Sequence, residues 1–203
     1  MMMKGLWLGL VVGIIFTCLL GQWVFSAASK ETDSPTGISP EIVAEYVHSV
    51  VQADRIFYQT EIVARMREKG MVSSSEHWRV DGGLPLPVQF LQESGRLMAK
   101  QGKAIQFRLI SNWAINKESG PTTEFERTGL MKVLENPDRP FTAITTEGKA
   151  RSFQALYADK AVSQFCADCH NVHPKSPKRD FKAGDVMGGM LVTIDLPQVG
   201  KAN

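Results

Sequence analysis

Two cysteines and a histidine form a tight cluster near the carboxyl-terminal end of this 203-residue sequence. Cys166 and Cys169 are separated by two residues, and His170 follows the second cysteine at once. The third cysteine, Cys18, lies in an apolar amino-terminal run, so a disulfide network cannot hold the fold together. The chain must fold around an ordinary hydrophobic core, for which its length and its 43% hydrophobic residues suffice. The cluster therefore indicates a single chemical site.

The apolar run at the amino terminus predicts the compartment. Lys4 is followed by an uncharged stretch, residues 5–28, and a helix of about 20 apolar residues is long enough to cross a membrane. A cleaved signal peptide is the alternative, because residues 26–28 (Ser-Ala-Ala) could serve as a cleavage site. In both cases Lys4 stays on the cytoplasmic side. We expect a single-pass anchor in the cytoplasmic membrane, with the rest of the chain in the periplasm or an equivalent extracytoplasmic space.

Four kinds of site fit the cysteine cluster from its residues alone. Covalent haem attachment needs two thiols spaced to reach the vinyl groups at one porphyrin edge, with a histidine beside the iron. A zinc site could use Cys166, Cys169, His170 and His173, although zinc sites usually separate their cysteine and histidine pairs more widely. A thioredoxin-like redox pair and a structural disulfide are the others. We expect one haem c, because haem c is attached outside the cytoplasm and the cluster is predicted to be exported.

Composition and organisation exclude several classes of function. The formal net charge is only +2, so we expect no nucleic-acid partner. We find no nucleophile triad, paired-carboxylate motif or phosphate loop, and we do not expect an enzyme. The predicted domains are an anchor or signal peptide over residues 1–28, a polar linker over 29–39 and one folded domain over 40–203.

The folded domain is predicted to begin with a long amphipathic helix. Ser39 is a suitable N-cap and Pro40 a suitable first-turn residue, and the helix over residues 40–69 ends at Gly70. Its apolar positions recur near helical spacing. They are Val43, Val47, Val50, Phe57, Ile62 and Met66. This assignment places His48 and Arg55 on the opposite, polar side.

The remaining elements predict an α+β domain around an antiparallel sheet. Helices are expected over residues 88–101 and 122–135. Strands are expected over residues 105–109, 141–146, 151–157 and 189–196, the middle two joined at Glu147-Gly148. Helices combined with about four mostly sequential strands are typical of this fold class.

A resemblance to a known family begins at the cysteine cluster. Residues 166–189 read CADCHNVHPKSPKRDFKAGDVMGG and resemble the signature of the PAS-like c-type haem domains. The resemblance continues upstream in DRIFY (54–58), LPLP (84–87), FRLIS (107–111) and NPD (136–138). Such domains are the extracytoplasmic sensor regions of bacterial cyclases, histidine kinases and chemoreceptors, and they also occur as stand-alone haem proteins.

The resemblance implies a fold, a cofactor and residue roles. The haem would lie between a PAS-like sheet and the helices, with Cys166 and Cys169 as thioether anchors and His170 as the proximal iron ligand. Some stand-alone relatives use a distal cysteine, which the exported part of this sequence lacks. The cyclase, kinase and chemoreceptor relatives continue into an output module, whereas this sequence ends at Asn203. Signalling would therefore need a partner protein.

The sixth iron ligand is open at the level of sequence. His77 is the first candidate and Met66 the second, with Met71 close by, and an open or water-bound site is the alternative. His173 comes only three residues after His170 and is expected on the proximal side, bonded to a propionate or a backbone carbonyl or facing solvent. Gly184, Gly188 and Gly189 are expected to permit a tight turn and a close approach to the porphyrin.

Two functions follow from these expectations. The first is redox or small-ligand sensing by a membrane-anchored haem domain. The second is electron transfer to or from a membrane oxidoreductase by a tethered cytochrome. A basic run near the cluster could neutralise propionates or steer an acidic redox partner; it consists of Lys175, Lys178, Arg179 and Lys182. A homodimer formed through the long helix is a further expectation.

Overall fold

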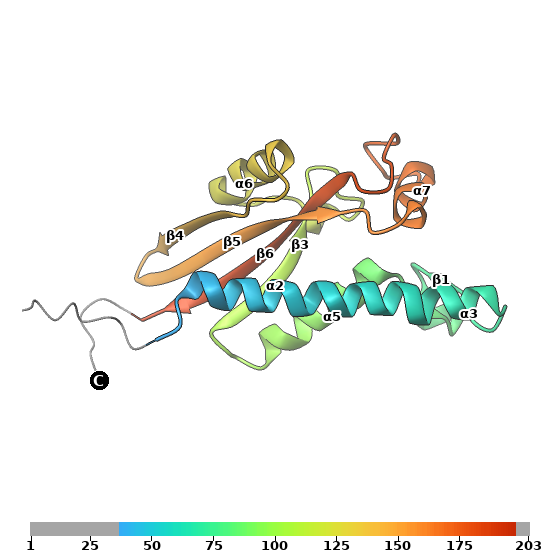
Figure 1. Ribbon diagram of the computed structural model, residues 1–203, viewed down its shortest axis with the longest axis horizontal. Coiled ribbons are helices and arrows are strands. Elements are labelled where there is room, and N and C mark those ends of the chain that lie inside the picture. Colours follow the sequence, from blue (N-terminus) through green and yellow to red (C-terminus); the bar gives the residue numbers. More distant parts are fainter. Residues whose placement is uncertain (1–36, 198–203) are drawn as a thin grey trace, which may run out of the picture. The chain divides into compact units, whose positions relative to one another are not determined.

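A four-stranded antiparallel sheet organises the part of the chain that the computed structural model describes, residues 37–197 (Figure 1). Its strands are β3 (Ile105–Ile110), β4 (Phe141–Glu147), β5 (Ala150–Lys160) and β6 (Val186–Leu196). The spatial order is β3-β6-β5-β4, so the last strand of the chain is an inner strand. The predicted α+β class and antiparallel sheet are confirmed and fit a PAS-like fold. The order is sequential except that β3 pairs with β6.

The hairpin between β4 and β5 shows why the strands could be predicted. Glu147 pairs with Ala150, which leaves a two-residue turn. Gly148, the first residue of that turn, has φ +59°, a left-handed conformation that glycine adopts without steric cost. The turn lies one residue beyond the predicted position, and both strands are slightly longer than predicted.

Helices cover both faces of the sheet. Helices α2 (Pro40–Phe57) and α5 (Pro87–Lys100) lie on one face, and α6 (Glu124–Glu135) lies on the other (Figure 1). Because successive side chains of a strand point to opposite faces, each strand contributes to two cores. In β5, Ala155 and Tyr157 pack toward α2 and α5, while Leu156 packs toward α6.

The long helix forms as predicted but turns a different side to the sheet. It continues from α2 through a π-helical turn, η1 (Tyr58–Val63), into α3 (Ala64–Glu68). The Ser39 side chain accepts a bond from the Ile42 amide, and Pro40 begins the first turn. Its buried residues are Ala44, Val51, Arg55, Gln59 and Val63. The predicted apolar face is confirmed at Val43 and Val47, which pack against the core, and is wrong at Val50 and Phe57, so the buried face is rotated about the helix axis relative to the prediction.

Individual residues show the cause of this rotation. Val50 and Phe57, expected in the core, are 61% and 60% exposed. Arg55, expected in solvent, is 5% exposed because Asp159 of β5 pairs with it inside the protein. His48, also expected in solvent, is half-buried and stacks on the Tyr157 ring at a centroid distance of 4.0 Å.

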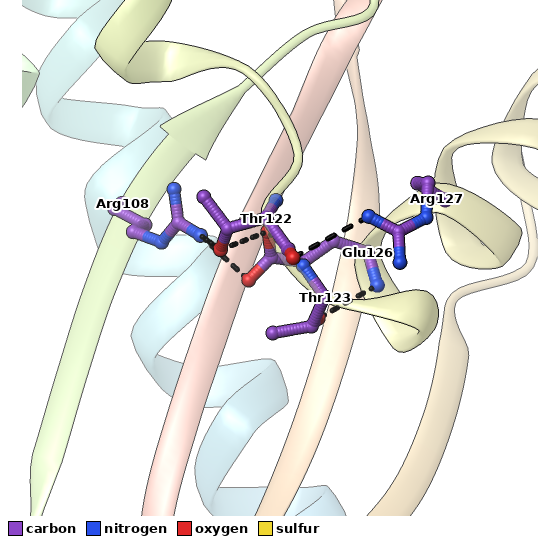
Figure 2. Close-up of polar contacts among 5 residues, drawn as sticks. All are labelled: Arg108, Thr122, Thr123, Glu126 and Arg127. Carbon is purple, nitrogen blue, oxygen red and sulfur yellow. Dashed lines mark hydrogen bonds and ion pairs between the residues drawn. The ribbon is translucent and has the colours of Figure 1, made fainter.

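Helix α6 is attached to the sheet through one buried carboxylate (Figure 2). Glu126 accepts bonds from the Thr122 and Thr123 amides and an ion-paired bond, 2.5 Å long, from Arg108 of β3. The Thr123 hydroxyl in turn accepts a bond from the Glu126 amide, which completes a capping box. This network fixes both the start of α6 and its position over β3.

The remaining described elements are short. They are β1 (Ser74–Ser75), which pairs in parallel with β2 (Leu84–Pro85), α4 (Trp78–Asp81), the 3₁₀ turn η2 (Lys117–Ser119) and α7 (Gln164–Val172). Within residues 37–197, no helix is long and apolar enough to span a bilayer. The predicted anchor (1–28), Cys18 and most of the predicted linker (29–39) lie outside the described residues.

Candidate functional site

The cysteine cluster lies on one helix, α7, at the end of the sheet. Cys166, Cys169 and His170 occupy positions i, i+3 and i+4, which share a face of an α-helix. All three residues line a cavity of about 500 Å³. Cavities of roughly 300–1,000 Å³ are typical of sites for small molecules and cofactors. The structure therefore brings the two predicted anchors and the predicted proximal ligand to one cavity.

The His170 ring is held in an orientation suited to metal binding. Its Nδ1 lies 3.3 Å from the Cys166 carbonyl oxygen, to which an N–H at that nitrogen donates. With the proton on Nδ1, the lone pair of Nε2 is free for a metal. The ring also meets the edge of Phe181 at a centroid distance of 5.9 Å. Burial lowers the pKa of His170, which favours the neutral imidazole that an iron requires.

The two thiols are separate and half-buried. Neither Cys166 nor Cys169 forms a disulfide among the residues that the structure describes. Burial raises the pKa of the Cys169 thiol, and the nearby Glu76 adds to the effect. No group of three or more cysteine, histidine or acidic side chains in the described part of the chain is arranged to hold a metal ion. The geometry therefore does not assemble the alternative zinc site with His173.

The rest of the cavity wall comes from segments far apart in the sequence. Apolar side chains line it from the start of α5, the end of β3, the loop after β3, the start of α7 and the start of β6. They are Leu86, Pro87, Val88, Leu109, Ile110, Ala114, Ile115, Phe165 and Met187. Polar side chains complete it: Ser74, Ser75, Glu76, Gln89, Gln92, Ser111, Asn116 and Ser119. The site thus combines an apolar lining with a few polar groups, as cofactor sites commonly do.

A buried ion pair forms another part of the wall. Arg55 donates from Nη1 to Oδ1 of Asp159, and both residues line the cavity. Burial works against the charge of Arg55, but Asp159 outweighs it and the pKa of Arg55 is raised. The Arg55 Nε atom is buried without a hydrogen-bond partner among the described residues. An unpaired guanidinium N–H on a residue that lines the cavity suits a ligand with carboxylate groups, such as haem with its propionates.

His173 connects α7 to the segment before α4. Its Nδ1 accepts a bond from the Lys175 amide, so the proton is on Nε2, which lies 3.2 Å from the Glu76 carboxylate. Both His173 and Glu76 line the cavity. For His173 the sequence predicts a bond to a propionate or to a backbone carbonyl, or a ring that faces solvent. The observed partner comes from a residue 97 positions away, which local spacing could not indicate.

The predicted distal ligands lie away from the cavity. His77 is exposed at the start of α4, Met66 is half-buried on α3, and Met71 is 64% exposed. None of the three lines the cavity in the described structure, so their role as ligands stays a prediction. Sequence reasoning did not single out Met187, which is 7% exposed at the start of β6 and lines the cavity. The sequence signal that could have indicated Met187 is its position directly before the paired glycines Gly188 and Gly189.

The glycines around the start of β6 have separate roles. Gly184 has φ +87°, so it turns the chain toward the strand as predicted. Gly188 lines the cavity, where an added Cβ would lie 2.4 Å from the Ile110 carbonyl oxygen. Gly189 lies against the Leu156 side chain instead. Close contact between β6 and its neighbours therefore explains Gly188 and Gly189.

Comparison with known proteins identifies a family. Residues 39–195 match the model of the family described as Tll0287-like. No curated protein matches the chain. Among solved structures, the cyanobacterial heme-protein Tll0287 is 16% identical, with a TM-score of 0.48 over 81% of this chain and 100% of that chain.

Proposed function

From the premise that the chain belongs to the Tll0287-like family, we propose that it is a haem protein that senses a redox change or a small ligand. Membership confirms the resemblance to PAS-like c-type haem domains that the sequence indicated. The observation that carries the proposal is the cavity shared by Cys166, Cys169 and His170. Anchoring in the cytoplasmic membrane, a periplasmic domain, the lack of an enzymatic activity and a signalling partner remain parts of the proposal.

Residues of this chain are suited to hold one covalent haem. When bound, haem supplies an iron that exchanges one electron and binds diatomic ligands. Cys166 and Cys169 offer two thiols on one helical turn, and His170 offers Nε2 while the Cys166 carbonyl holds Nδ1. Arg55 offers a buried N–H to a carboxylate. The apolar side chains of the lining would pack against the ring and reduce its contact with water.

The lining favours sensing over electron transfer. The start of α5 and the loop after β3 contribute Leu86, Val88 and Ile115 to the cavity. Aliphatic side chains do not coordinate iron, and they suit a small uncharged ligand. Beside such a wall, a haem held by His170 could bind carbon monoxide, nitric oxide or dioxygen, whereas coordination by Met187, which also lines the cavity, would favour electron transfer.

One observation favours the alternative, an electron carrier. Lys175, Arg179 and Lys182 follow α7 closely and are exposed. A basic surface of this kind steers an acidic redox partner toward the site. Lys178 contributes less to this surface than the other three basic residues, because it is half-buried. Its ammonium lies 4.6 Å from the centroid of the Phe181 ring.

Covalent attachment is tested by expressing the full chain with a c-type haem maturation system. We expect haem to remain with the denatured protein on a gel, and to be lost in the Cys166→Ala/Cys169→Ala variant. Cys18→Ala is the matched control and should keep its haem. Absence of covalent haem from the wild-type protein would disprove the proposal.

Spectra of the same protein distinguish the two functions. Under sensing, the reduced protein binds carbon monoxide and its Soret band shifts, whereas a six-coordinate carrier does not respond. His77→Ala and Met187→Leu should leave the spectrum unchanged under sensing. Loss of a low-spin spectrum in either variant would identify that residue as a sixth ligand and favour electron transfer.

A further inference from the structure

A buried phenylalanine ring packs against the ring of the predicted proximal ligand. Phe181 is 2% exposed, and its ring lies at 83° to the His170 ring with a centroid distance of 5.9 Å. Perpendicular aromatic pairs at about 4.5–7 Å contribute about 0.5–1.5 kcal/mol beyond the area that they bury. The His170 ring therefore has a second neighbour besides the Cys166 carbonyl, on the segment that follows α7 in the chain.

The bond to the carbonyl does not by itself fix the His170 ring. Its Nδ1 atom lies 3.3 Å from the Cys166 carbonyl oxygen, beyond the usual range of about 2.7–3.2 Å. The outer side-chain torsion of a histidine has broad minima, so one long bond at one ring atom restricts the ring only loosely. Packing against Phe181 narrows this rotation, because a turned imidazole would collide with the phenyl ring or leave a gap beside it.

The backbone of Phe181 is held by the residue that follows His170. The side-chain Nδ2 of Asn171 donates to the Phe181 carbonyl (2.8 Å), and its Oδ1 accepts a bond from the Phe181 amide (2.9 Å). The two bonds satisfy both backbone groups of Phe181, as a neighbouring strand would. Such a pair needs a side chain that both donates and accepts, which an asparagine amide does. Helix α7 thus fixes Phe181 relative to its own histidine across ten residues.

The Phe181 ring has further neighbours that keep it in place. The Trp113 ring, from the loop after β3, lies at 79° to it with a centroid distance of 5.5 Å. The Lys178 ammonium is 4.6 Å from its centroid, within the range of a cation–π contact. Ala167 of α7 and Met187 of β6 belong to the same buried cluster. The phenyl ring is therefore a fixed surface against which the imidazole rests.

We propose that Asn171 and Phe181 form a clamp that fixes the rotation of the His170 ring and so the direction of its Nε2 lone pair. The clamp itself does not depend on the proposed function, whereas its effect on an iron rests on it. Groups that orient a metal ligand from behind commonly change the strength of its bond to the metal. Asn171 and Phe181 act through His170, so both are positioning residues.

Nuclear magnetic resonance of the full chain without haem tests the clamp directly. The chain has only four histidines, so isotope-labelled histidine gives few ring signals. We expect an ordered His170 ring with its proton on Nδ1, and loss of this order in Phe181→Leu and in Asn171→Leu. The matched control is Phe125→Leu, which removes a phenyl ring packed against Phe141 on the α6 face of the sheet. A freely rotating ring in the wild type, or an ordered ring in both clamp variants, would refute the clamp.

Electron paramagnetic resonance of the oxidised, haem-loaded protein tests the effect on the iron. We expect narrow signals in the wild type and Phe125→Leu, and broadened signals in Phe181→Leu and Asn171→Leu, because the ligand ring would then occupy several rotations. The double variant Phe181→Leu/Asn171→Leu should broaden the signals no further than Phe181→Leu, because both residues act through one contact. Reduced stability with unchanged signals would show that the two residues only support the fold, and would overturn the proposal.

The two experiments separate this inference from the proposed function. An ordered His170 ring in a chain that acquires no covalent haem would support the clamp and reject the proposed function. Covalent haem in a protein whose His170 ring rotates freely would support the proposed function and reject the clamp.

Discussion

Arg108 and Arg55 each pair with a buried carboxylate, and the two pairs lie on opposite faces of the same sheet. Glu126, on the α6 face, has a partner for each carboxylate oxygen, since Arg108 binds Oε1 and the start of α6 binds Oε2 (Figure 2). Arg55, on the α2 face, pairs with Asp159 through Nη1, but its Nε has no partner among the described residues.

The exposure of the two arginines differs as well. The Arg108 side chain is 41% exposed and that of Arg55 is 6% exposed. A satisfied network holds a fold together, whereas a partly satisfied buried one is usually found where a protein binds something else. The Glu126–Arg108 pair therefore holds α6 on the sheet, whereas the Arg55–Asp159 pair forms part of the cavity wall.

The largest expected effect comes from breaking the pair at the cavity. Arg55→Met leaves the Asp159 carboxylate buried without a counter-charge, and we expect a loss of about 3–5 kcal/mol in the free energy of unfolding. Denaturant titration of the full chain measures it. The double variant Arg55→Met/Asp159→Leu should recover most of the loss, because it removes both charges. A loss below about 1 kcal/mol in the single variant would contradict the distinction between the pairs.

A smaller effect is expected on the other face. Glu126→Ala removes the capping bonds of α6 and the partner of Arg108, and we expect a loss of about 1–3 kcal/mol. Arg108 is already partly exposed and water can solvate it, which limits the loss. Thr123→Ala is the matched control and should cost about 1 kcal/mol, since it removes one capping bond. An Arg108→Ala effect larger than that of Arg55→Met would reverse the ranking of the two pairs.

The Glu126 pair also predicts a pH dependence. Burial raises the pKa of Glu126, but the bonds from Thr122 and Arg108 outweigh it and lower the pKa below its ordinary 4.5. The carboxylate therefore stabilises the fold above pH 4.5, and this contribution is lost as the pH falls through the lowered value. Unfolding midpoints measured from pH 6 down should fall less steeply in Glu126→Gln than in the wild type. Parallel curves would show that Glu126 titrates alike in both states.

The smallest effect is expected at the edge of the same cluster. Arg127 lies 3.1 Å from Glu124, and both side chains are more than half exposed. Arg127→Ala should change stability by less than about 0.5 kcal/mol, because exposed ion pairs contribute little. Adding 1 M salt should leave the difference between variant and wild type near zero. A larger loss would mean that the bond from Arg127 to the Thr122 carbonyl supports the cap.

Local pattern was sufficient for the strands and for the start of the long helix. Ile105, Phe107 and Leu109 alternate with polar residues, and that period alone defines a half-buried strand. The cysteine spacing likewise predicted the three residues that meet at the cavity. These features depend on residues a few positions apart, so the sequence displays them directly.

Long-range partners explain what local pattern missed. The buried face of α2 depends on Asp159, which is 104 positions from Arg55, and on Tyr157 beneath His48. The contact between His173 and Glu76 crosses 97 positions. A polar residue is normally expected in solvent, and only the fold reveals a partner that makes its burial favourable.

Because β6 is the last strand of the chain but an inner strand of the sheet, the sheet cannot be completed until β6 has been made. During synthesis, β3 and β5 are made before Val186–Leu196, which lies between them in the finished sheet, so they cannot make their final pairings until that strand is in place. The thiols of Cys166 and Cys169 precede that strand, so they emerge while the sheet is still open. For covalent haem attachment as proposed above, the two thiols would be accessible to a ligating enzyme before β6 completes the sheet.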